Sequence, residues 1–295
     1  MTCPCESGLA PSACCRRSGG RWYKVPDPFE PAPPLTGFAH PQCYLHPTYD
    51  CSETLENEHY VTATVLRTIG STLRVSGFSW VKESISRDIP VEQFTARVLC
   101  SRHNRALSPI DTQGGRFVRW IRDFCNSSTP PSRARVLFSG HDVERWCPKT
   151  FLGLMAAGTL KSGPGQVIRR VSVSPQVIDL FFGRVLDEWG RGLWVRTDPQ
   201  HTVNTELAIS CEAVVDRATN QVLGLTFNFF GFDFAFSIVP TTVDDSVFRP
   251  SHLKFHMPGG LYTIELSWAP GVPHSGPVEW DWGGRNTGKS TSSRV

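Results

Sequence analysis

Seven of the ten cysteines in this 295-residue chain lie within its first 100 residues, and most of them are closely spaced. We expect no secretory signal, because residues 1–9 are polar and contain no apolar stretch. Thiols stay reduced in the cytosol, so such spacing favours metal ligands over disulfides. We therefore expect bound metal to organise the first third of the chain. Cys125, Cys147 and Cys211 are expected to be ordinary buried thiols.

The composition is that of a globular protein with a substantial core. Apolar residues make up 40% of the chain and charged residues only 19%, and there are 18 phenylalanines and 9 tryptophans to bury. No window approaches 18 consecutive apolar residues, so no membrane-spanning helix is expected. The sequence thus predicts a soluble cytoplasmic protein. The net charge of +3 neither requires nor excludes a polyanionic partner.

The first cysteine cluster has the pattern C-x-C-x8-C-C, in the stretch CPCESGLAPSACC. Four thiolates within thirteen residues can close a tetrahedral zinc site, and Ser7-Gly8 supplies a turn that folds the chain back. A peptide this short has no apolar core, so the metal would have to hold it together. The predicted zinc ligands are Cys3, Cys5, Cys14 and Cys15.

This stretch resembles the SEC-C motif, a small zinc-binding module with the pattern CPCGSG followed by a terminal pair. The resemblance implies that residues 1–24 form an accessory module that contacts a protein partner or nucleic acid. Residues 25–42 are rich in proline and are predicted to form an extended linker.

A second metal site is predicted from two distant C-x-x-H pairs, Cys43/His46 and Cys100/His103. Such pairs can join into one zinc knuckle, since thiolates and imidazoles are ligands that suit zinc. Cys51 could take the place of His46, and the sequence leaves both open.

Between these pairs, Glu58-His59 precedes an apolar run, and Asn104 directly follows the second pair. In this order the residues resemble the HNH endonucleases, whose ββα-metal fold is often braced by a zinc knuckle. The resemblance covers about residues 43–117 and assigns an HNH-like domain to residues 43–125. It implies that His59 is the general base and that Glu58 and Asn104 hold Mg²⁺ or Mn²⁺ against a DNA phosphate. Gln93 is the nearest candidate for the middle asparagine of the family, and residues 71–86 would be an inserted hairpin.

Arginines are concentrated around and after this second pair, with almost no acidic residues among them. Arginine next to aromatic side chains suits phosphate contact, although the same spacing is also typical of a solvated helix face. The candidate nucleic-acid-binding residues are Arg102, Arg105, Arg116, Arg119 and Arg122.

Two helices are predicted from periodicity and capping. Apolar residues recur at helical spacing over 114–124, and residues 139–157 begin with a capping serine and an acidic first turn, with a kink expected near Pro148. Gly231 interrupts one apolar alternation and predicts a turn or bulge. The predicted strands of this half cover 166–174, 206–216, 222–239 and 261–269.

The sequence as a whole therefore predicts an α+β protein. A loop at 126–132 is expected to separate the HNH-like domain from a helix and an antiparallel β-rich domain over 133–282, and a flexible tail follows at 283–295. The leading functional hypothesis is an HNH-type DNA endonuclease with two structural zinc ions. The alternative is a non-catalytic, zinc-stabilised protein that binds nucleic acid or protein, and a third is a structural protein that interacts through its β-rich domain.

Overall fold

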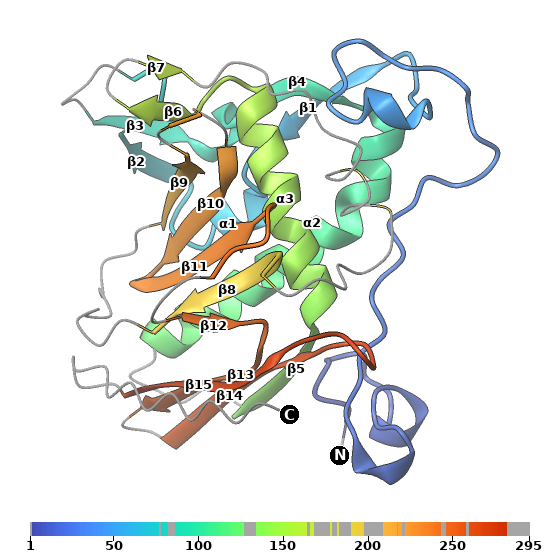
Figure 1. Ribbon diagram of the computed structural model, residues 1–295, viewed down its shortest axis with the longest axis vertical. Helices are drawn as coiled ribbons and strands as arrows, with labels where there is room; N and C mark the ends of the chain where they lie inside the picture. Colours follow the sequence, from blue (N-terminus) through green and yellow to red (C-terminus); the bar gives the residue numbers. More distant parts are fainter. Residues whose placement is uncertain are drawn as a thin grey trace.

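The computed structural model describes residues 2–76, 78–81, 86–126, 134–163, 166–167, 178, 182, 190–197, 209–216, 218–219, 222–242, 246–257 and 260–281. The chain is a mixed α+β structure with two long helices and several sheets, and its C-terminal region is rich in strands (Figure 1). The expected boundary at 126–132 and the tail at 283–295 fall almost wholly outside the described residues.

Two paired strands and a long helix form a strand–strand–helix unit that begins after Cys51. Strand β1 (Leu55–His59) pairs antiparallel with β4 (Thr95–Cys100), and helix α2 (Ser101–Asn126) begins directly after β4. The predicted helix at 114–124 is confirmed as the second half of α2. Between β1 and β4 lie a short helix, a two-stranded antiparallel pair and a 3-10 turn, namely α1 (Ala63–Leu66), β2 (Thr72–Val75), β3 (Arg87–Pro90) and η4 (Val91–Gln93). The hairpin predicted at 71–86 therefore contains β2, but its second strand, β3, lies beyond the predicted range.

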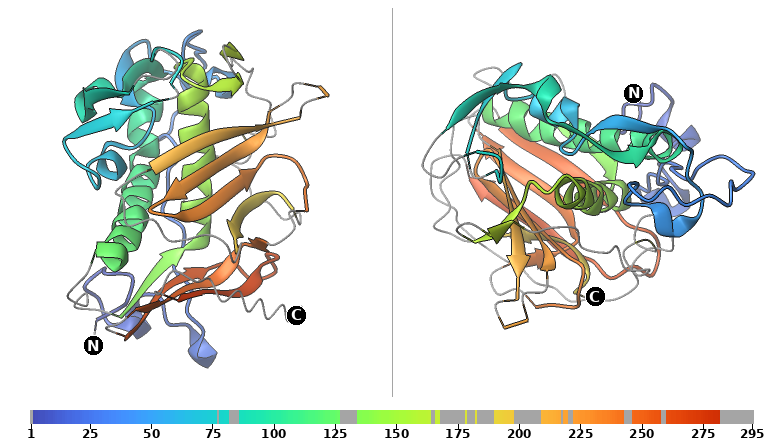
Figure 2. Two further views of the ribbon diagram at one scale, coloured as in Figure 1. Left: turned by 90° about the vertical axis from the view of Figure 1, so that its left-hand side faces the viewer. Right: turned by 90° about the horizontal axis from the view of Figure 1, so that it is seen from above.

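Helix α3 (Gly140–Ala156) occupies the centre of the molecule and packs along α2 (Figures 1 and 2). It begins where predicted, because the Ser139 hydroxyl accepts the N–H of Asp142 (3.3 Å), and it contains Pro148. The two helices approach closely at Gly114, where a Cβ atom would lie 2.4 Å from the Trp146 ring. Nearly all of α3 is buried, so the charged side chains that it carries require buried partners.

One face of α3 is covered by a five-stranded antiparallel sheet in the order β12-β8-β11-β10-β9. Phe230 and Gly231 both have positive φ, 55° and 90°, which produces the tight primed turn between β10 and β11. The predicted turn at Gly231 is thus confirmed. The strands are β8 (Gly192–Arg196), β9 (Ile209–Val215), β10 (Val222–Phe229), β11 (Phe232–Ser237) and β12 (Ser246–Phe248).

A second sheet, in the order β15-β13-β14-β5, lies at the lower end of α3 in Figure 1. Its strands are β5 (Arg135–Ser139), β13 (Pro250–Met257), β14 (Gly260–Ser267) and β15 (Ser275–Asp281). The expectation of a purely antiparallel domain is wrong for this sheet, because β5 pairs parallel with β14 and β13 parallel with β15. Since β5 precedes α3 and the whole five-stranded sheet, the chain reaches β14 only after a long crossover, which permits parallel pairing.

The core is continuous across these parts. Buried apolar side chains from Phe29 to Trp280 form one cluster that includes α2, α3 and both sheets. A small separate pair of strands, β6 (Lys161–Gly163) and β7 (Gln166–Val167), accounts for the described part of the predicted strand at 166–174. Among the helices of the described ranges, none combines the length and apolar character needed to cross a membrane.

Candidate metal centres and the residues around them

The first cluster brings together the four cysteines that the sequence predicted. The sulfur atoms of Cys3, Cys5, Cys14 and Cys15 all lie within 4.8 Å of one another. The Cys5–Cys14 and Cys14–Cys15 sulfurs are 3.3 and 3.5 Å apart, close to the roughly 3.8 Å edge of a tetrahedral zinc–thiolate site. The chain folds back through Glu6 and Gly8, both at positive φ, and the Cys3 N–H bonds the Leu9 carbonyl (2.8 Å). These residues could hold one zinc ion.

The N-terminal module is docked on the rest of the molecule rather than held apart from it. The Leu137 N–H in β5 donates to the Pro4 carbonyl (3.1 Å), and the Leu137 side chain packs against the cysteines. Arg116 on α2 donates to Glu6 (2.7 Å). The module therefore covers the open edge of β5, as Figure 1 shows at the lower right.

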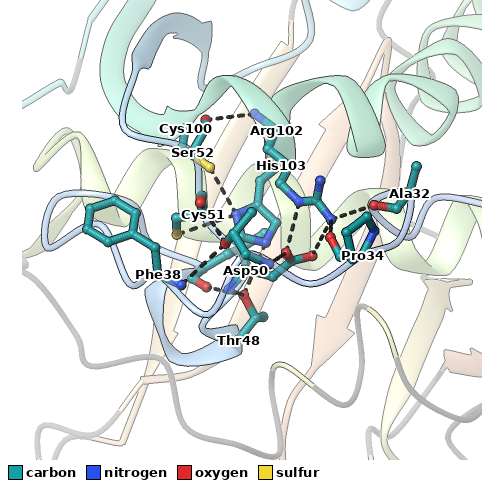
Figure 3. A network of polar contacts seen from close by, with 12 residues as sticks. Ala32, Pro34, Phe38, Thr48, Asp50, Cys51, Ser52, Cys100, Arg102 and His103 are labelled. Atoms are coloured by element: carbon teal, nitrogen blue, oxygen red, sulfur yellow. Dashed lines mark hydrogen bonds and ion pairs between the residues drawn. The ribbon is translucent and has the colours of Figure 1, made fainter.

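The second cluster consists of Cys43, Cys51, Cys100 and His103, all buried. The three sulfurs lie 3.6, 3.7 and 3.1 Å from His103 Nδ1. A tetrahedral zinc ion with Zn–S of about 2.3 Å and Zn–N of about 2.0 Å requires roughly 3.6 Å between sulfur and nitrogen. Cys100 ends β4 and His103 lies in the first turn of α2, so the metal would sit at the strand–helix junction (Figure 3).

The ring of His103 is held in the tautomer that a metal at Nδ1 requires. The Thr48 hydroxyl donates its one hydrogen to the Leu45 carbonyl (2.8 Å) and lies 3.1 Å from His103 Nε2. The hydroxyl oxygen must therefore accept the Nε2–H, which leaves the Nδ1 lone pair free for a metal.

His46 is not part of this cluster, which corrects one of the two alternatives that the sequence left open. It is exposed, and its Nδ1 contacts the Cys43 carbonyl at 2.9 Å. The 3-10 turn η3 (His46–Thr48) ends at Tyr49 in a left-handed conformation, and this bend brings Cys51 back to Cys43. Cys51 therefore takes the fourth position.

The segment around this cluster is fixed by Arg102. Its guanidinium pairs with Asp50 (2.9 Å) and donates to the Pro34 carbonyl (2.9 Å), so it attaches the proline-rich segment to the knuckle (Figure 3). The Ser52 hydroxyl accepts the Arg102 N–H (3.2 Å) at the start of α2. Arg102 therefore has a structural task that the sequence did not indicate.

The other predicted arginines divide into two groups. Arg116 is held by Glu6, and Arg122 pairs with Asp123 (2.7 Å). Arg105 and Arg119 are exposed, and among the described residues neither has a hydrogen bond or ion pair. Only these two of the five arginines are available to a partner.

Glu58 and Asn104, the expected ligands of a divalent cation, are occupied by protein groups. Glu58 is 5% exposed and forms an ion pair with Lys149 of α3, which also contacts Asp111 (2.8 Å). Burial raises the pKa of Glu58, and Lys149 opposes that effect. The Asn104 amide donates to Glu56 (2.6 Å). A donor set whose buried carboxylate already binds an ammonium group does not fit Mg²⁺ or Mn²⁺.

His59, the expected general base, ends β1 and is half-buried. Its Nε2 atom is buried and has no hydrogen-bond partner among the described residues. Burial, followed by the charges of Arg67 and Lys149, lowers the pKa of His59, while a hydrogen bond to the Val91 backbone opposes that effect. Gln93 is exposed in η4, so the Val91 backbone contacts the ring where the resemblance assigned Gln93.

Three residues of this site were not identified from the sequence: Glu56, Asp111 and Lys149. Glu56 lies two positions before Glu58 on β1, and Asp111 lies two helical turns after Asn104 on α2. Strand and helix periodicity could therefore have identified Glu56 and Asp111. Lys149 lies 91 positions from Glu58, and no local pattern connects them. No family model, curated protein or solved structure matches the chain, so the metal centres rest on their geometry.

Proposed function

We propose that the chain is a non-catalytic, zinc-stabilised DNA-binding protein built on an HNH-like ββα unit. The order of β1, β4 and α2, with a cluster of three cysteines and one histidine where β4 meets α2, supports the relationship to that fold. The observation that carries the proposal is the Lys149 ammonium on Glu58, because it occupies the carboxylate that a catalytic cation would need. Both zinc ions then act as structural braces.

The exposed face of α2 supports DNA as the partner. Its exposed residues are Arg105, Ser108, Thr112 and Arg119. Arg105 and Arg119 are two heptads apart, so they point in nearly the same direction about 21 Å from each other. The two arginines suit phosphate oxygens, and the acid that follows them on α2, Asp123, is paired with Arg122.

Charge reversal on this face tests DNA binding. Arg105→Glu and Arg119→Glu should each weaken duplex DNA binding about tenfold and lower the salt dependence by about one counterion, measured by fluorescence anisotropy at several salt concentrations. Arg87→Glu is the matched control, since Arg87 is exposed on β3 and has no described partner. Equal affinity of all three variants and the unaltered protein would contradict the DNA assignment and favour a protein partner.

The second candidate is the metal-dependent DNA endonuclease, and His59 is the observation that favours it. Its buried Nε2 has no partner among the described residues, so this nitrogen is left for a proton exchange with a bound water molecule. Incubation of the purified chain with supercoiled plasmid and Mg²⁺ or Mn²⁺ separates the two candidates. We expect no cleavage; cleavage that His59→Ala abolishes without loss of zinc would establish the nuclease instead.

A further inference from the structure

The Lys149 ammonium group lies between two carboxylates, in a position that a metal cation could also occupy. The side chain is 2% exposed and contacts the carboxylates of Glu58 on β1 and Asp111 on α2. The Asp111 carboxylate also accepts the Thr62 hydroxyl (2.6 Å), and Thr62 in turn accepts the Trp146 indole N–H (2.8 Å). Two separate elements, β1 and α2, thus place carboxylate oxygens on one buried positive charge, and Thr62 holds one of the two carboxylates.

A second observation points to the same place. The Tyr44 hydroxyl is buried and has no hydrogen-bond partner among the described residues. Burial, followed by the nearby carboxylates of Glu58 and Asp111, raises the pKa of Tyr44 well above its ordinary value. Tyr44 therefore presents a buried, neutral hydroxyl group without a described partner, and the charges of both acids act on it.

The charge balance of the site depends on Lys149. Glu58 and Asp111 carry two negative charges and Lys149 supplies one positive charge, so removal of Lys149 leaves two carboxylates without a cation. Oxygen ligands with carboxylate charge are what Mg²⁺ and Mn²⁺ bind. The Asp111 side chain is 21% exposed, which gives an ion from solvent a route to the site.

We propose that Lys149 is a built-in cation that blocks a divalent-cation site, and that its replacement by a short neutral side chain opens this site to one Mn²⁺ or Mg²⁺ bound by Glu58 and Asp111. The inference rests on the same Lys149–Glu58 contact as the proposed absence of catalysis, but it requires no DNA binding. Failure of either proposal therefore leaves the other testable.

The test is Mn²⁺ binding by the full-length, zinc-loaded chain, measured by electron paramagnetic resonance of free Mn²⁺. The unaltered protein should take up none, and Lys149→Ala should take up one ion per chain. The double variant Lys149→Ala/Glu58→Gln should bind at least about tenfold more weakly, since it lacks one charged ligand. Mn²⁺ should also raise the melting temperature of Lys149→Ala and not that of the unaltered protein.

Lys149→Ser covers the case in which the alanine variant does not fold, because it keeps a polar atom at this position and is still short. Refolding of Lys149→Ala by Mn²⁺ alone would support the proposal. Folded Lys149→Ala or Lys149→Ser without Mn²⁺ uptake at millimolar concentration would overturn it, and so would uptake that is unaffected by Glu58→Gln.

Discussion

The sulfur of Cys51 lies 3.7 Å from Nδ1 of His103, although the two residues are 52 positions apart. This contact joins the loop before β1 to the first turn of α2. It completes a buried set of three cysteines and one histidine around the point where β4 ends. The position of α2, and with it the exposed arginine face, depends on this junction.

The first prediction separates Cys51 from His46 as the fourth ligand. Cys51→Ser should lower the zinc content of the purified chain from two ions to one and destabilise it, because structural zinc contributes directly to folding. His46→Ala should keep both ions, since His46 is exposed. Elemental analysis after gel filtration measures both variants, and the reverse pattern would assign the site to His46.

The second prediction concerns the buried pair between Glu144 of α3 and Arg249. Two contacts of 2.8 Å join them, and Arg249 is fully buried. Glu144→Gln should cost about 3–5 kcal/mol of unfolding free energy, because it leaves a buried guanidinium without its counter-charge. Urea unfolding measures the loss.

The control for this pair is Glu279→Gln. Glu279 pairs with Lys254 at 2.7 Å, and its side chain is 41% exposed. An exposed pair contributes about 1 kcal/mol or less. Similar losses in the two variants would show that Arg249 does not depend on Glu144.

The third prediction tests the approach of α2 to α3. Gly114→Ala should lower the unfolding free energy by about 1–3 kcal/mol, since its Cβ would overlap the Trp146 ring. Gly70→Ala is the control, because the nearest atom to its Cβ would lie 3.4 Å away. If Gly114→Ala is as stable as Gly70→Ala, α2 and α3 are farther apart at Gly114 than the structure shows.

The fourth prediction is a pH dependence from Asp142. Burial raises its pKa from the ordinary 3.8 to about 6, although Lys24 acts in the opposite direction. Between these two values the folded chain binds a proton that the unfolded chain has released. The stabilising contribution is therefore complete below about pH 4 and is lost as the pH rises through 6.

Asp142→Asn removes this titration. The unfolding free energy of the unaltered chain, relative to that of the variant, should fall by about 2 kcal/mol between pH 4 and pH 7. Denaturant unfolding at a series of pH values gives both curves. Parallel curves would mean that Asp142 titrates normally in the folded chain.

Local patterns were sufficient for the features that depend on local chemistry. The spacing of Cys3, Cys5, Cys14 and Cys15 predicted their cluster, and Ser139 predicted the start of α3. The C-x-x-H spacing of Cys43 and His46 favoured the wrong histidine, because spacing does not show that the chain bends at Tyr49.

Long-range pairings were not predictable in this way. The parallel pairing of β5 with β14 joins segments 128 positions apart (Arg135 with Thr263), and an apolar alternation does not specify its partner strand. Glu58 looked like an available metal ligand because its counter-ion, Lys149, lies on a helix that the sequence assigned to another domain.

The zinc content of the unaltered chain tests the central claim most directly. Two buried four-ligand clusters should give two zinc ions per chain by elemental analysis of protein purified without added metal, and chelation of both should unfold the strand–strand–helix unit. A content of one zinc or none, in a chain that is folded and stable in chelator, would contradict the account.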